Sequence, residues 1–206
     1  MYNNIELCVK VDKYSMTENF TSNIGVKQGD NLSPTLFKIF INDILDSFDE
    51  TCKPAILNSL QLNCLLYADD LVLMSETADG LQRCIDKLYN YCDKWGLQIN
   101  IKKTKSVVFN KTGKLDEKIF NINNIPIERA RSYKYLGIYV SASGSFTEAK
   151  DDLYKKGLKA LFKYKKSLNL YKPKINTLSH IFDHTVKPVL LYGSEIWGSS
   201  VINKLY

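Results

Sequence analysis

Residues 60–75 read LQLNCLLYADDLVLMS, which is two apolar runs flanking the polar break Ala68-Asp69-Asp70. Each run is too short for a separate buried helix, whereas its length is ordinary for a buried strand. We therefore predict a β-hairpin with both strands largely buried and with the two carboxylates at its turn.

The adjacent carboxylates of Asp69 and Asp70 have two explanations. Asp is common in turns, but two-residue hairpin turns favour Asn-Gly or Asp-Gly, and this pair lacks the Gly that eases positive φ. A divalent cation would instead hold both carboxylates ionised and close together. Spacing alone leaves a turn and a metal site equally open.

The segments before this hairpin predict a second hairpin and a helix. Residues 5–12 and 19–27 alternate loosely between apolar and polar, as paired strands do. A loop over residues 28–34 then leads into a helix, for which Ser33 is the expected N-cap and Pro34 the first helical residue. Apolar residues continue at helical spacing as far as Phe48.

The segments after the hairpin predict one amphipathic helix, several strands and two terminal helices. The first helix covers residues 77–95 and ends at Gly96. Its inward side chains are expected to be Leu81, Cys84, Ile85, Leu88, Cys92 and Trp95. Strands are predicted at 97–101, 106–110, 119–122 and 133–140, and helices at 147–168 and 174–192. This order predicts an α+β protein with a helical appendage and a boundary near residue 145.

Composition excludes several classes of protein. No apolar run reaches the ~18 residues of a membrane span, and no signal peptide follows Met1. The five Cys include no CxxC pair, so we expect reduced, buried thiols in an intracellular protein of the nucleus or cytoplasm. His180 and His184 lack the Glu of a zinc-protease motif and are interpreted as structural.

Positive charge is concentrated near the C-terminal side of the chain. The net charge is +6, and residues 150–174 contain nine Lys against Asp151 and Asp152. By itself such a run is most simply interpreted as a solvated helix face.

Four motifs in order resemble those of reverse transcriptases. Residues 67–70 (YADD) are similar to the family's YxDD metal motif, and residues 25–37 (GVKQGDNLSPTLF) to its G-x-x-Q-G…L-S-P…L-F segment. Gly96-Leu97 with Asn100 and Lys103-Thr104 resembles the G-L…N…K-T segment, and residues 135–137 (YLG) the turn associated with gripping the primer. The whole is most similar to the enzymes of non-LTR (LINE-type) retrotransposons, and residues 186–198 resemble the region after their thumb.

This resemblance implies a partial polymerase palm over residues 1–145, an antiparallel sheet with helices on one face that lacks the first catalytic strand and the fingers. A thumb and the following helical region would occupy residues 146–206. The resemblance implies an RNA-directed DNA polymerase that joins dNTPs to a primer 3′-hydroxyl with two Mg²⁺, Mn²⁺ being possible. RNA template, DNA primer and their hybrid would be its partners, with no membrane and an unknown oligomeric state.

The resemblance also assigns roles to individual residues. Asp69 and Asp70 would be the catalytic metal ligands, and Lys103 would assist the pyrophosphate, although a solvated Lys is an equal alternative there. Nucleotide and template binding is assigned to Gln28, Gly29, Ser33, Pro34, Tyr67 and Ala68. Primer binding is assigned to Tyr135, Leu136 and Gly137. The Lys-rich helix becomes a candidate for contact with the nucleic-acid backbone, with Tyr154, Phe162 and Tyr164 available for stacking or for core packing.

One element of the family's site is not found. A third carboxylate normally lies on an earlier strand in a D…A-F-D segment, and no residue before Gly25 carries that pattern. Asp12 lies in the first predicted hairpin and does not fit this position. We therefore expect that this chain alone does not polymerise DNA. A catalytically dead relic that binds nucleic acid is the alternative function.

Overall fold

The computed structural model describes residues 5–22, 25–110, 118–171 and 174–198. Contacts divide the chain into two compact units. Unit 1 is Met1–Ile99 with Asn121–Ile125, and unit 2 is Asn100–Phe120 with Pro126–Tyr206. Helices and strands occur in both units, which confirms the α+β class. The boundary predicted at residue 145 stays a prediction.

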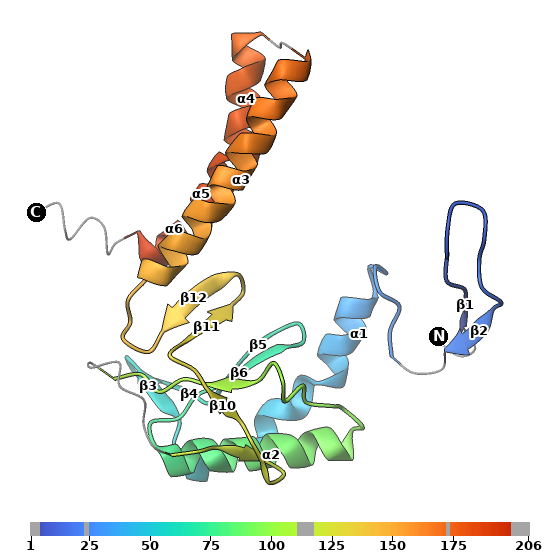
Figure 1. Ribbon diagram of the computed structural model, residues 1–206. Coiled ribbons are helices and arrows are strands. Elements are labelled where there is room, and N and C mark those ends of the chain that lie inside the picture. The colour runs from blue at the N-terminus through green and yellow to red at the C-terminus, as the bar shows by residue number, and fades with distance from the viewer. Residues whose placement is uncertain (1–4, 23–24, 111–117, 172–173, 199–206) are drawn as a thin grey trace, which may run out of the picture. The chain divides into compact units, whose positions relative to one another are not determined.

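Unit 1 consists of short hairpins and two main helices (Figure 1). Its strands are β1 (Ile5–Leu7), β2 (Phe20–Ser22), β3 (Ala55–Leu57), β4 (Leu60–Leu62), β5 (Cys64–Tyr67), β6 (Asp70–Leu73) and β8 (Asn121–Ile122). Its helices are α1 (Ser33–Phe40), the 3-10 helices η1 (Asn42–Ser47) and η2 (Glu50–Cys52), and α2 (Ala78–Lys94). The antiparallel pair β1–β2 confirms the first predicted hairpin, with shorter strands than expected.

The start of α1 differs from the prediction. Ser33 is the first helical residue, Leu32 holds the N-cap position, and no side chain caps the helix. The Ser33 hydroxyl instead donates a 2.6 Å hydrogen bond to the carbonyl of Lys27, which closes the preceding loop. Ser33 therefore shapes the loop rather than the helix. The predicted helix is also interrupted, because α1 ends at Phe40 and continues as η1.

Helix α2 holds the core of unit 1. The Thr77 hydroxyl accepts from the Gly80 amide at 3.0 Å and caps its start, and Gly96 follows its end with a φ of 67°. The buried cluster contains Ile44, Leu88, Tyr91 and Cys92, against which Leu71 and Leu73 pack. The predicted inward face was wrong at its end, because Trp95 is 40% exposed and Tyr91 is buried instead.

Two hairpins occupy the region where one was predicted. Residues 60–62 belong to β4, which pairs with β3, and the hairpin of the two carboxylates is β5–β6 alone. The prediction that both strands are largely buried was wrong, since Leu65 is 42% exposed and Leu66 37%. The physical reason is that β5 and β6 form a two-stranded sheet, so among the described residues no third strand flanks β5 and its side chains stay partly accessible.

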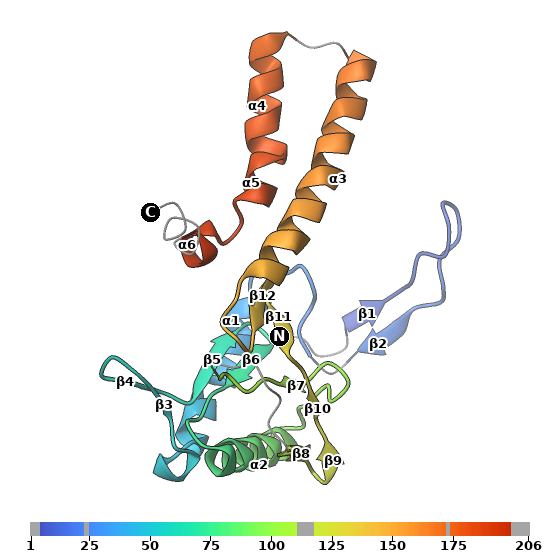
Figure 2. The ribbon, with the colours of Figure 1, turned by 60° about the vertical axis from the view of Figure 1, so that its left-hand side comes forward.

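Unit 2 combines a hairpin with a helical arm (Figure 2). Its strands are β7 (Lys105–Ser106), β10 (Glu128–Arg129), β11 (Ser132–Tyr135) and β12 (Ile138–Ser141), while β9 (Ile125–Pro126) spans the division between the units. Its helices are α3 (Thr147–Tyr171), α4 (Ile175–Thr185), α5 (Lys187–Leu190) and α6 (Ser194–Trp197). Residues 97–101 are not a strand, and the predicted strand over 133–140 is the hairpin β11–β12.

The helical arm is built on α3, beside which α4 runs back (Figure 2). The Tyr164 hydroxyl donates to the Leu178 carbonyl at 3.0 Å, and its ring meets Phe182 edge-on, so Tyr164 packs between the two helices. The helix predicted over 174–192 is divided into α4 and α5, with Val186 between them and Pro188 near the start of α5.

No helix in the described parts of the chain is long and apolar enough to cross a membrane. All five cysteines are free thiols. Cys52, Cys84 and Cys92 are buried as predicted, whereas Cys8 is exposed.

Candidate functional site

The turn between β5 and β6 carries both carboxylates. Tyr67 lies opposite Asp70, which leaves Ala68 and Asp69 as the two turn residues. Ala68 has a φ of 53°, in the left-handed region that residues other than Gly seldom adopt. Such outliers are retained mainly at functional sites.

The side chains of β6 point alternately to a face that packs against α2 and to a face that is open. Leu71 and Leu73 pack against the α2 cluster. Asp70 and its cross-strand partner Tyr67 fall on the opposite face, because successive residues of a strand point to opposite sides. Helix α2 therefore supports the hairpin from one side and leaves the acidic end of the other face exposed.

Asp69 and Asp70 are both exposed, and neither carboxylate has a hydrogen bond or an ion pair within the described residues. Two adjacent carboxylates without partners are suitable donors for a hard divalent cation such as Mg²⁺. They supply part of a ligand set only, since no three His, Cys, Asp or Glu side chains in the described residues are placed to hold a metal.

The loop before α1 holds the predicted template and nucleotide residues. Gln28 and Pro34 are exposed, whereas Ser33 is buried by its bond to Lys27. Gly29 has a φ of 83° with open space around the position of an added Cβ, so the turn itself requires glycine. The open space leaves this backbone accessible to a ligand.

Lys103 and residues 135–137 belong to unit 2, whereas the carboxylates belong to unit 1. Lys103 is exposed in a turn, where its amide donates to the Asn100 carbonyl at 3.1 Å. Asn100 thus orders the segment that presents Lys103.

The half-buried turn of β11–β12 is a second feature with unusual backbone. Tyr135 pairs with Ile138, so Leu136 and Gly137 are the turn residues, with φ of 45° and 87°. Positive φ at both positions is typical of the tight turns that join twisted antiparallel strands. The turn residue Leu136 lacks the freedom of glycine, so other contacts must stabilise its conformation.

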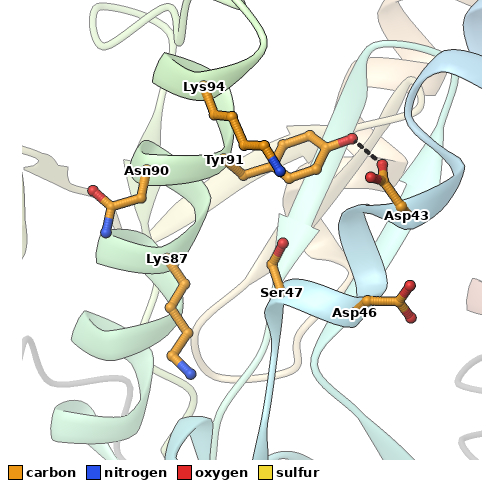
Figure 3. A pocket seen from close by; sticks show the side chains of 7 residues that line it. All are labelled: Asp43, Asp46, Ser47, Lys87, Asn90, Tyr91 and Lys94. Atoms are coloured by element: carbon orange, nitrogen blue, oxygen red, sulfur yellow. Dashed lines mark hydrogen bonds between the residues drawn. The ribbon is translucent and has the colours of Figure 1, made fainter.

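A shallow polar hollow lies elsewhere in unit 1, between η1 and α2 (Figure 3). Its lining residues are Asp43, Asp46, Ser47, Lys87, Asn90, Tyr91 and Lys94. The Tyr91 hydroxyl donates to Asp43 at 2.6 Å, and burial together with this carboxylate raises the pKa of Tyr91. The lining of the hollow does not include the carboxylates of β5–β6.

Residues 2–140 match the family model described as reverse transcriptase (RNA-dependent DNA polymerase). This chain belongs to the reverse transcriptase family. The matched residues include both carboxylates, the loop before α1, Lys103 and the turn of β11–β12.

Relatives of this chain extend the similarity further along it. It is 35% identical over 62% of its length to the Retrovirus-related Pol polyprotein of the type-2 retrotransposable element R2DM of Drosophila melanogaster. It is 30% identical over 91% of its length to the Retrovirus-related Pol polyprotein of the type-1 retrotransposable element R2 of Popillia japonica. It is 27% identical over 88% of its length to the RNA-directed DNA polymerase of the mobile element jockey of Drosophila melanogaster. The predicted retrotransposon family is confirmed. The chain spans 13%, 26% and 20% of the lengths of these three relatives, respectively.

One neighbour of the β11–β12 turn was missed from the sequence. Tyr192 lies against this turn, although it is 56 residues away along the chain. The only signal was the resemblance of residues 186–198 to a family segment, to which no role was assigned.

Proposed function

We propose that this chain is part of an RNA-directed DNA polymerase of a retrotransposable element, with a partial palm over residues 1–145 and a thumb over 146–206. The single observation that carries the proposal is the pair of carboxylates of Asp69 and Asp70, which have no partner among the described residues, at a strained hairpin turn inside the matched region. The retrotransposon names of the relatives support the choice of template and product.

Asp69 and Asp70 are the residues that would hold divalent ions, Asp69 directly and Asp70 beside it. When bound, two such ions activate an attacking hydroxyl and neutralise a leaving pyrophosphate. The chain's own contribution is position: α2 fixes the apolar face of the hairpin, so the carboxylates remain at its exposed end.

The other predicted site residues bind and orient substrates. The amide of Gln28 and the open backbone at Gly29 are available to the template strand and the incoming dNTP. Lys103, exposed at the end of its turn, supplies positive charge for the pyrophosphate. The β11–β12 turn would bind the primer.

Helix α3 supplies a basic stripe, defined as Lys155, Lys159, Phe162, Lys163 and Lys166. These exposed residues recur at helical spacing on one face, whereas Leu153 and Gly157 are buried on the other. Positive charge with an exposed aromatic ring suits the backbone and bases of an RNA–DNA hybrid, which needs little base readout. Phe162 is 65% exposed, so of the two rings Phe162 and Tyr164, the former is available for stacking.

Primer extension tests the proposal. The protein is expressed with the reading frame that surrounds these 206 residues, on an RNA template with a DNA primer, dNTPs and Mg²⁺. We expect extension that falls at least about a hundredfold in Asp69→Asn, because charge stabilisation of the transition state is lost. The control is Asp46→Asn, which removes an exposed carboxylate from the polar hollow and should retain activity. Equal activity of wild type and Asp69→Asn would refute the proposal.

The second candidate is a nucleic-acid-binding module without catalysis, which the basic stripe favours. The two functions differ in their response to metal. A pure binder should lose hybrid affinity with rising salt, yet be indifferent to Mg²⁺ and to Asp69→Asn. For the 206-residue chain alone we propose binding without extension, in the nucleus or cytoplasm.

A further inference from the structure

The segment that follows α5 folds back onto the turn of β11–β12. The Tyr192 hydroxyl donates a 2.7 Å hydrogen bond to the carbonyl of Leu136. The Tyr192 ring also covers Gly137, because a Cβ added there would lie 3.1 Å from the ring edge. Both turn residues are thus in contact with one side chain.

Tyr192 is itself fixed by its neighbours. The Trp197 indole donates from Nε1 to the Tyr192 carbonyl at 2.9 Å. Trp197 packs in turn against the buried cluster of Ile138, Ala149 and Leu153. The next residue, Gly193, has a φ of 66° and approaches Ile138 so closely that an added Cβ would lie 3.0 Å from Cδ1. The segment is therefore tied to the first residue of β12, to α3 and to the turn.

These contacts stabilise the unfavourable backbone conformation of the turn. Leu136 holds a φ of 45° without the freedom of glycine, and such a conformation persists only where the surroundings fix it. The hydrogen bond to its carbonyl restrains the peptide plane between Leu136 and Gly137. Within unit 2, the order of this turn depends on a side chain 56 residues downstream.

We propose that Tyr192 is a positioning residue for primer binding, holding the Leu136–Gly137 turn in the conformation that receives the primer 3′ end. The proposal rests on the proposed function, in which this turn binds primer. It assigns a role to the two hydrogen bonds made by residues 192–197: Trp197 fixes Tyr192, and Tyr192 fixes the turn.

The test compares two tyrosines that each donate to a backbone carbonyl in unit 2. Tyr192→Phe removes the bond to Leu136 and keeps the ring, and Tyr164→Phe removes the matched bond to Leu178 far along the helical arm. Both are made in the complete polymerase, with KM for primer–template, KM for dNTP, kcat, and hydrogen exchange of the amides of residues 134–140 as readouts.

We expect Tyr192→Phe to raise the KM for primer–template by roughly two- to tenfold, the effect of one lost hydrogen bond. The KM for dNTP should stay within about twofold, and exchange at the turn should accelerate. Tyr164→Phe should change none of these, and Trp197→Phe should follow Tyr192→Phe more weakly. An unchanged primer KM in Tyr192→Phe, or an equal rise in Tyr164→Phe, overturns the proposal.

The outcomes separate this inference from the proposed function. If wild type extends primers and Tyr192→Phe behaves like wild type, the function stands and the inference fails. If wild type neither binds nor extends a primer, the proposed function fails, and primer positioning fails with it. Exchange at the turn then still reports whether Tyr192 restrains it.

Discussion

The Lys134 ammonium lies 2.9 Å from the Asp152 carboxylate and joins β11 to α3. Lys156, one helical turn later, binds the same carboxylate at 2.8 Å. Asp152 thus links the β11–β12 hairpin to the first turns of the helical arm, and these cations lower its pKa, Lys156 more than Lys134.

This link predicts an acid-dependent loss of stability. Because the folded-state pKa of Asp152 lies below its ordinary value of 3.8, its stabilisation is complete above that pH and is lost as the pH falls through the folded pKa. Asp152→Asn should lower the free energy of unfolding at pH 7 by about 1 kcal/mol or less and flatten the acid limb. Urea unfolding between pH 2 and 7 measures both. Asp151→Asn is the neighbouring control, and an identical profile for the two variants would contradict the link.

The β5–β6 hairpin should be more stable when its charge is removed. Asp69 and Asp70 are adjacent like charges without partners in the described residues, so Asp69→Asn breaks no contact. We expect a melting temperature equal to or above that of wild type without metal. Mg²⁺ should raise the melting temperature of wild type and have less effect on the variant. A clear loss of stability in metal-free Asp69→Asn would mean that this carboxylate has a structural role.

The basic stripe should determine the salt dependence of hybrid binding. Each Lys that neutralises a phosphate contributes about 0.7–0.9 to the slope of log affinity against log salt. Lys159→Ala with Lys166→Ala should therefore reduce the slope by roughly one to two. The control pair is Lys87→Ala with Lys94→Ala, from the polar hollow on α2. Fluorescence anisotropy of a labelled RNA–DNA duplex from low to high salt gives the slopes, and equal slopes for the two pairs would exclude α3 as the contact.

Gly80 should not tolerate a side chain. A Cβ there would lie 2.5 Å from the Cys52 carbonyl and 2.5 Å from the Ser75 hydroxyl, where η2 meets α2. Gly80→Ala should destabilise by about 1–3 kcal/mol despite the higher helix propensity of Ala. Gly157→Ala, which meets only the side chain of Leu190, should cost less. Chemical denaturation of both variants ranks them, and the reverse order would contradict this packing.

Thiol reactivity should follow burial. Burial raises the pKa of Cys84 to about 12 and that of Cys64 to about 11, so neither forms appreciable thiolate near neutral pH. Cys8 is exposed. Iodoacetamide should therefore modify Cys8 first in the native protein and reach Cys84 only in denaturant, as peptide mass spectrometry would record. Modification of native Cys84 at the rate of Cys8 would contradict the fold around α2.

The spacing of apolar residues predicted the long helix α2 correctly, but it did not predict which residues are buried at the end of this helix. The apolar spacing of residues 81–92 predicted α2 correctly, because a helix that packs on one side repeats its buried positions. Spacing could not show that Trp95 lies just beyond α2, at its C-cap, where the helical repeat of buried positions no longer applies. The structure buries Tyr91, which hydrogen-bonds Asp43 across the chain.

Several features of the candidate site depend on the folded structure and cannot be predicted from the local sequence pattern. The YADD motif located the carboxylates, but the positive φ of Ala68 is a property of the folded hairpin. Ser is a residue type that often caps helices, but the Ser33 hydroxyl instead closes a loop by donating to the Lys27 carbonyl. Tyr192 approaches Leu136 across 56 residues, a distance over which hydrophobic periodicity carries no information.

The path of the chain constrains how such proteins can be recombined. It leaves unit 1 after Ile99, returns at Asn121 and leaves again after Ile125, so no single peptide bond separates the two units. A crossover near residue 145 would exchange α3 while keeping the parental β12, and Ile138 would then face a foreign partner in place of Leu153. Chimeras between related elements should tolerate junctions that carry residues 126–198 as one block better than junctions between the hairpin and its helices.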